Sequence, residues 1–181
     1  MQISLEAVAQ TQHLIGSEFG RQTYHTLYDL LSEQPMEKLV AISAANIQRM
    51  DATFARESLV ALAKRFQGQR VLCLIDFDDR DHLDNCSYAA QKEEVTFLAW
   101  QGAEYQVIGQ QLSKSWKRIL DFVQTNGTST TNDVVRALNI SIQNAGVTMK
   151  KMVEQGLLIR EDGVTVTGGR ECHYQTVKPP R

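Results

Sequence analysis

The sequence has few cysteines and no long hydrophobic run. Cys73, Cys86 and Cys172 are an odd number without CxxC spacing, which argues against a disulfide framework or a zinc site and favours a reducing cytoplasm. No apolar stretch approaches the roughly 18 residues that a membrane-spanning helix needs. The N-terminal residues lack a basic leader followed by an apolar segment. We therefore expect no secretion signal, no membrane association and a cytoplasmic protein.

The common motifs of enzyme active sites are absent as well. The chain contains no G-x-x-x-x-G-K-[ST], no G-x-S-x-G and no H-E-x-x-H segment, and its four histidines are scattered. His82 and Cys86 have the i, i+4 spacing of neighbours on a helix, which alone is weak support for a redox or metal site. We therefore predict no catalytic residues and no cofactor.

One acidic segment allows two interpretations, a metal site and a solvated loop. Asp76 to Asp84 holds five acids in nine positions directly after an apolar run, and carboxylates at a strand end are able to bind Mg²⁺ or accept a phosphoryl group. The segment lacks the Gly and bidentate Glu of a calcium loop. A solvated loop that opens a helix, where the helix dipole favours acids, is the simpler interpretation, and we predict no metal.

The small net charge of −2 conceals a difference between the two ends of the chain. Residues 113–181 contain ten Lys/Arg and six Asp/Glu, a net charge of +4, whereas residues 1–112 carry nine Lys/Arg and fifteen Asp/Glu, a net charge of −6. We predict two domains with their boundary at this point. A basic module joined to an acidic one suits a nucleic-acid-binding domain attached to a partner-binding or sensing domain.

The last third of the chain has the pattern of three short helices and a hairpin. Apolar spacing and capping residues predict helices at Trp116–Gly127, Thr130–Leu138 and Ile142–Gln155. Two β-rich runs, Val164–Thr167 and Arg170–Val177, flank a Gly-Gly pair that suits a two-residue turn. This order predicts a small α+β winged helix-turn-helix domain, which places one helix for entry into the major groove of DNA.

The start of the third helix carries side chains suited to reading DNA. Gln and Asn side chains are able to bond adenine edges, and the methyl groups of Val and Thr are able to contact the thymine methyl group. Ser141 is placed to cap the helix or to bond a phosphate, and an Arg on the wing suits a narrow minor groove. The predicted DNA-binding residues are Ser141, Gln143, Asn144, Thr148, Lys150, Lys151 and Arg170.

A family resemblance supports this interpretation. Met149-Lys-Lys-Met-Val-Glu-Gln-Gly-Leu-Leu158 resembles a recurring segment in winged-helix transcription regulators of bacteria, of the multiple-antibiotic-resistance and arsenic-repressor types. The sequence departs from their pattern at Gly146, where a polar helix-forming residue is usual. The resemblance implies binding to double-stranded DNA as a homodimer on half-sites about one helical turn apart. The alternative is a protein-protein adaptor in a signalling or defence complex, in which the winged helix contacts protein.

The first 112 residues alternate helices with apolar strands, which predicts an α/β domain with a mixed sheet. The expected helices are Gly20–Ser32, Thr53–Phe66 and Asp81–Glu94, and the expected strands are Leu39–Ser43, Arg70–Phe77, Val95–Trp100 and Ala103–Ile108.

A second resemblance concerns Asp51-Ala-Thr-Phe-Ala-Arg-Glu57, which is similar to a segment of STAS-like domains in small bacterial proteins. This resemblance implies that the domain works through a protein partner. It also marks Thr53 as a candidate phospho-switch, because a phosphate at a helix N-terminus adds about −1.5 to −2 charge. The simpler interpretation, which we favour, is that Thr53 caps the helix after Asp51.

Overall fold

The structure is a computed structural model that describes residues 1–34, 38–164 and 170–179. These residues divide into two compact units. One is formed by Met1–Gln111 with Pro179 from the chain end, and the other by Leu112–Lys178. Each unit contains its own sheet and its own helices. In the part of the chain that the structure describes, no helix combines the length and apolar character needed to cross a membrane.

The first unit is built on a five-stranded sheet with the order β1-β3-β5-β6-β7. Its strands are β1 (Gln2–Ser4), β3 (Leu39–Ser43), β5 (Val71–Ile75), β6 (Thr96–Gln101) and β7 (Glu104–Gly109). The first four are parallel, and β7 is antiparallel to β6. Every residue of β5 is buried, as expected for a continuous apolar strand inside a parallel sheet. The mixed α/β prediction is confirmed.

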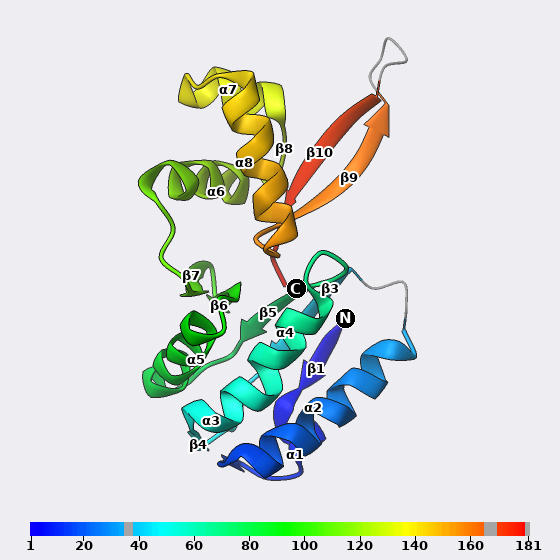
Figure 1. The fold of residues 1–181 in the computed structure, drawn as a ribbon, viewed down its shortest axis with the longest axis vertical. Helices are drawn as coiled ribbons and strands as arrows, with labels where there is room; N and C mark the ends of the chain where they lie inside the picture. Colours follow the sequence, from blue (N-terminus) through cyan, green and yellow to red (C-terminus); the bar gives the residue numbers. More distant parts are fainter. Residues whose placement is uncertain (35–37, 165–169, 180–181) are drawn as a thin grey trace. The chain divides into compact units, whose positions relative to one another are not determined.

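Helices connect the parallel strands (Figure 1). They are α1 (Leu5–Ala9), α2 (Ser17–Ser32), the continuous series α3 (Ala52–Ala55), η1 (Arg56–Val60) and α4 (Ala61–Phe66), and α5 (Arg80–Lys92). Each crossover leads to the next strand in the same direction across the sheet, and parallel crossovers that share one hand place their helices on one face. One core cluster accordingly joins side chains of these helices to Val40, Ile42, Leu72, Leu74 and Phe97 of the sheet.

The Asp51 carboxylate forms hydrogen bonds at the beginnings of two helices. It follows β4 (Arg49–Met50), which pairs in parallel with β2 (His13–Leu14). Its carboxylate accepts hydrogen bonds from the backbone N–H of Phe54 at 2.6 Å and of Gly16 at 3.0 Å. Asp51 is therefore the N-cap of α3. Our prediction that Thr53 is the cap was wrong, because Thr53 lies half-buried inside the first turn.

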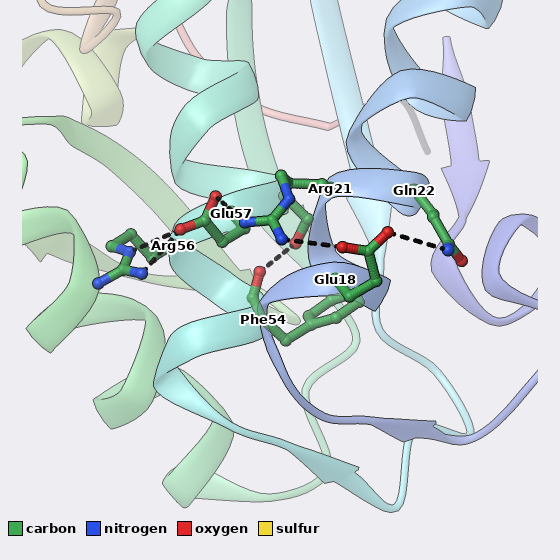
Figure 2. A network of polar contacts seen from close by, with 7 residues as sticks. Glu18, Arg21, Gln22, Phe54, Arg56 and Glu57 are labelled. Carbon is green, nitrogen blue, oxygen red and sulfur yellow. Dashed lines mark hydrogen bonds and ion pairs between the residues drawn. The ribbon is translucent and has the colours of Figure 1, made fainter.

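The predicted helix from Thr53 to Phe66 is interrupted by the π-helical turn η1, where α2 approaches closely. A Cβ on Gly20 would lie only 2.8 Å from the Cβ of Glu57, so glycine permits the approach. Beside this contact, Arg21 donates to Glu18 at 2.9 Å and lies 3.7 Å from the Glu57 carboxylate (Figure 2). Turns of this type are often found at functional sites, but here the neighbouring charges pair with one another.

The second unit has the element order of a winged helix-turn-helix domain. Its elements are α6 (Lys114–Asn126), β8 (Thr128–Thr130), α7 (Thr131–Leu138), α8 (Ile142–Glu154), β9 (Leu158–Val164) and β10 (Arg170–Thr176). The three strands form an antiparallel sheet with β10 in the centre. A compact core includes Ile119, Leu120, Val134, Met149 and Met152, all of which are fully or almost fully buried. The three helices agree with the prediction.

The strands of this unit differ from the prediction in two respects. The strand β8 was not foreseen, and β9 begins at Leu158, six residues before the predicted start at Val164. The reason is pairing, because Leu158 to Val164 lies opposite Thr176 to Arg170 over the whole length of the ladder. The Gly168-Gly169 turn, with the predicted strand residues 165–167, lies outside the described residues.

Candidate nucleic-acid interface

The turn between α7 and α8 is fixed by local hydrogen bonds. The helix α7 ends at Leu138, and its C-cap residue Asn139 has a left-handed φ of 52°, a conformation that Asn tolerates. Two residues later, the hydroxyl of Ser141 accepts the backbone N–H of Asn144 at 3.2 Å and caps α8. The predicted capping role of Ser141 is confirmed. A capped start orients the first turn of α8, which is the part that a helix-turn-helix domain presents to DNA.

The start of α7 is held by a reciprocal pair of hydrogen bonds. The backbone N–H of Asp133 donates to the Thr130 hydroxyl, and the Asp133 carboxylate accepts the backbone N–H of Thr130 at 2.8 Å. The Thr130 hydroxyl also donates to this carboxylate at 2.7 Å. The hydrogen bond from the Thr130 backbone, and then the one from its side chain, lower the pKa of Asp133. The ionised form of Asp133 is therefore the one that accepts these bonds and caps the start of α7.

One face of α8 is exposed and rich in polar side chains. Its residues recur at the spacing of one helix face and are all exposed: Gln143, Asn144, Val147, Lys150 and Lys151. The two amides supply hydrogen-bond donors and acceptors of the kind that read base edges. The two lysines supply positive charge. The structure therefore places four of the seven predicted DNA-binding residues on one face, namely Gln143, Asn144, Lys150 and Lys151, and Ser141 caps the same helix.

Thr148 does not belong to this face. We predicted it among the DNA-contacting residues, but only 7% of it is exposed. It follows the buried Ala145 by three residues and precedes the buried Met152 by four, so the helical repeat turns it inward. Its hydroxyl donates to the side-chain oxygen of Asn144 at 3.2 Å. Thr148 therefore orients the Asn144 side chain through this hydrogen bond from the buried side of α8.

The lysines of this face are electrostatically available. Within the described ranges 1–34, 38–164 and 170–179, neither Lys150 nor Lys151 forms an ion pair with an acid. The acid nearest in the helix is Glu154, one turn towards the C-terminus and exposed. This face of α8 therefore carries two positive charges, with one acid a turn beyond them.

The described side chains of the wing include more acids than bases. Arg160 forms an ion pair with Asp162 at 3.0 Å. Gln175 donates to Glu161 at 2.8 Å, and His173 lies 3.7 Å from Glu171. These acids therefore already face donor groups within the hairpin. Arg170, the predicted minor-groove contact, begins β10, and its side chain lies outside what the structure describes.

Gly146 offers a test of how α8 itself is built. A Cβ at this position would meet only Thr131 Cγ2, at an ordinary 4.0 Å. Because alanine favours a helix interior over glycine by about 1 kcal/mol, Gly146→Ala is expected to stabilise the second unit by roughly that amount. Denaturant unfolding followed by circular dichroism measures the change.

The matched control for this substitution is Gly156→Ala. Gly156 follows α8 with a φ of 75° and nothing near its Cβ position. Alanine there is expected to destabilise by about 1 kcal/mol, because side chains disfavour left-handed backbone. A loss of stability in Gly146→Ala would show that α8 is not packed as the structure describes.

Two carboxylates of the acidic segment in the first unit form structural hydrogen bonds. Asp76 accepts a hydrogen bond from the Ser43 hydroxyl at 2.6 Å, and Asp79 caps α5 by accepting the N–H of Asp81 at 2.9 Å. No cluster of three His, Cys, Asp or Glu side chains able to hold a metal ion is found within the described chain. The metal interpretation of Asp76–Asp84 therefore receives no support.

The two buried thiols, Cys73 and Cys86, have low reactivity. Burial raises the pKa of Cys73 and of Cys86 to about 12, so both remain protonated at neutral pH and are poor nucleophiles and poor metal ligands. His82, one turn before Cys86, is also buried. The redox or metal interpretation of the His82–Cys86 pair is therefore disfavoured.

Comparison with known proteins yields one similarity. Residues 110–165 match the model of the MarR family. No curated protein and no solved structure matches the chain. The matched residues extend from the segment before α6 to the end of β9, so they include the capped turn and the exposed face of α8. The C-terminal unit thus contains a helix-turn-helix domain similar to those of the MarR family of regulators.

Proposed function

We propose that this protein is a transcription regulator that binds double-stranded DNA through the exposed face of α8. One observation carries the proposal: two amide side chains and two lysines share the outward face of a capped helix that follows a tight turn, and the lysines form no ion pair with an acid among the residues that the structure describes. The similarity of residues 110–165 to the MarR family supports it.

The roles of the residues follow from their chemistry. Gln143 and Asn144 face the base edges, where amides form paired hydrogen bonds with adenine. Lys150 and Lys151 contact phosphates, as Ser141 is also able to do through its hydroxyl hydrogen. Arg170, beside the tip of the wing, reaches the minor groove.

The remaining features of the proposal concern the complete assembly. The protein acts in the cytoplasm as a homodimer on two related half-sites, the common arrangement for winged-helix regulators. The first unit, which we assign to the STAS-like class on the basis of residues 51–57, docks a protein partner or receives a signal. A phosphate on Thr53 in the first turn of α3 is one form that this signal would take.

A protein-protein adaptor is the second candidate function. The described part of the wing favours it, because its acidic side chains outnumber its basic ones and such a hairpin adds little attraction for phosphates. In that function, the exposed face of α8 would contact a protein surface.

An electrophoretic mobility shift with the full chain tests the two functions. Genomic fragments from the native host are the probe, and the salt concentration is varied. DNA binding predicts a shift at low salt that weakens steeply as salt rises, because binding releases condensed counterions. The absence of a shift with any duplex at low salt would eliminate the regulator and leave the adaptor.

A further inference from the structure

Val147 occupies the centre of the exposed face of α8. Successive residues of an α-helix are separated by about 100°. Gln143 and Lys151 lie one turn before and after Val147, and Asn144 and Lys150 lie at three residues on either side. Val147 is 52% exposed. An apolar side chain therefore lies in the middle of the four polar side chains that the proposed function assigns to DNA.

We propose that Val147 selects thymine by packing its methyl groups against the 5-methyl group of the base in the major groove. The inference rests on the proposed DNA-binding function and adds a feature of the preferred sequence. The thymine methyl is the one apolar group on the major-groove edge of the base pairs, and apolar side chains recognise it by contact. A hydrogen-bonding residue at this position would favour other edges.

The charges around Val147 identify a nucleic acid as the occupant. Lys150 and Lys151 lie within one turn of it and form no ion pair with an acid in the residues described. An apolar protein surface covering Val147 would also have to cover these two ammonium groups. Duplex DNA provides an apolar methyl group between two rows of phosphates, which matches both parts of the surface.

Two other residues of α8 carry methyl groups that could contact thymine, but neither lies at the centre of the exposed face. Thr148, whose methyl group would be the alternative, is buried. Ile142 is 62% exposed, but it is five residues earlier and so lies about 140° around the helix from Val147. Ile142 therefore provides a comparison residue on the same helix, exposed and apolar but on a different side.

The experiment compares thymine with uracil, which differs only in lacking the methyl group. A duplex is first selected from a random library with the full chain, and each thymine is then replaced singly by deoxyuridine. For the wild type, affinity is expected to fall about fourfold at one or two positions, the factor that corresponds to one buried methyl-sized group. Val147→Ala is expected to bind both versions of the duplex equally, at the lower affinity.

Two comparisons separate this effect from others. Ile142→Ala is expected to keep the thymine preference, since its side chain lies on another side of the helix. If Val147→Ala retains the preference, the preference comes from DNA shape, and the proposal fails. It also fails if no uracil substitution matters, or if Ile142→Ala alone removes the preference. Selection of no duplex by the wild type would instead refute the DNA-binding function itself.

Discussion

Replacing Gly109 with alanine is expected to destabilise the first unit by about 3 kcal/mol or more. Gly109 ends β7 with a φ of 96°, and a Cβ there would lie 2.1 Å from the backbone oxygen of Val95 and 3.2 Å from the Cβ of Ala90. Left-handed backbone costs alanine roughly 1–2 kcal/mol. Overlap with a backbone atom adds roughly 1–3 kcal/mol, because the connection between α5 and β6 has to move. Denaturant unfolding of the full chain measures this loss.

Gly102→Ala separates the two contributions to this loss. Gly102 lies in the turn of the same β6–β7 hairpin and also has a positive φ, 60°, but no atom lies within 4 Å of its Cβ position. Its substitution should therefore cost only the conformational part, about 1–2 kcal/mol. Equal losses in the two variants would mean that β7 does not pack against the α5–β6 connection as described.

The sequence was sufficient for the elements whose apolar pattern is long and regular. The helix α6 extends over Lys114–Asn126, close to the predicted Trp116–Gly127, because three of its apolar residues repeat on one buried face. The strands that were missed have little local signal. For example, β8 is Thr-Ser-Thr, and its existence depends on pairing with Gln175 to His173, more than forty positions away. Such short strands are determined by tertiary contacts that a local pattern does not contain.

Predictions of site residues were correct where they relied on the spacing of buried residues along a helix. They were less accurate where they relied on the chemical type of a residue alone. Thr148 was chosen for its small polar side chain, although its spacing from Ala145 and Met152 already indicated the buried face. Similarly, Asp51 and Thr53 are both good cap residues. The choice between them is made by the pairing of β2 with β4, which places Asp51 beside Gly16. The spacing of buried residues is the signal that would have corrected Thr148.

The double variant Lys150→Ala/Lys151→Ala is expected to lose the largest part of the DNA affinity. Each lysine that neutralises a phosphate contributes about 0.9 to the slope of log affinity against log salt. Removing both should lower this slope by about two and weaken binding on the order of tenfold to a hundredfold near 0.1 M salt. The loss should be similar for all sequences, because phosphates carry no base identity. Fluorescence anisotropy of a labelled duplex at several salt concentrations gives both quantities.

The pair Lys114→Ala/Lys117→Ala provides the matched control. Both lysines are exposed on α6 of the same unit, so the control changes the net charge by the same amount at a different place. If the interface is the exposed face of α8, the control should retain most of the salt slope, because counterion release counts contacts with phosphates. Equal losses in the two double variants would mean that net charge alone attracts DNA, and the interface assigned to α8 would then be wrong.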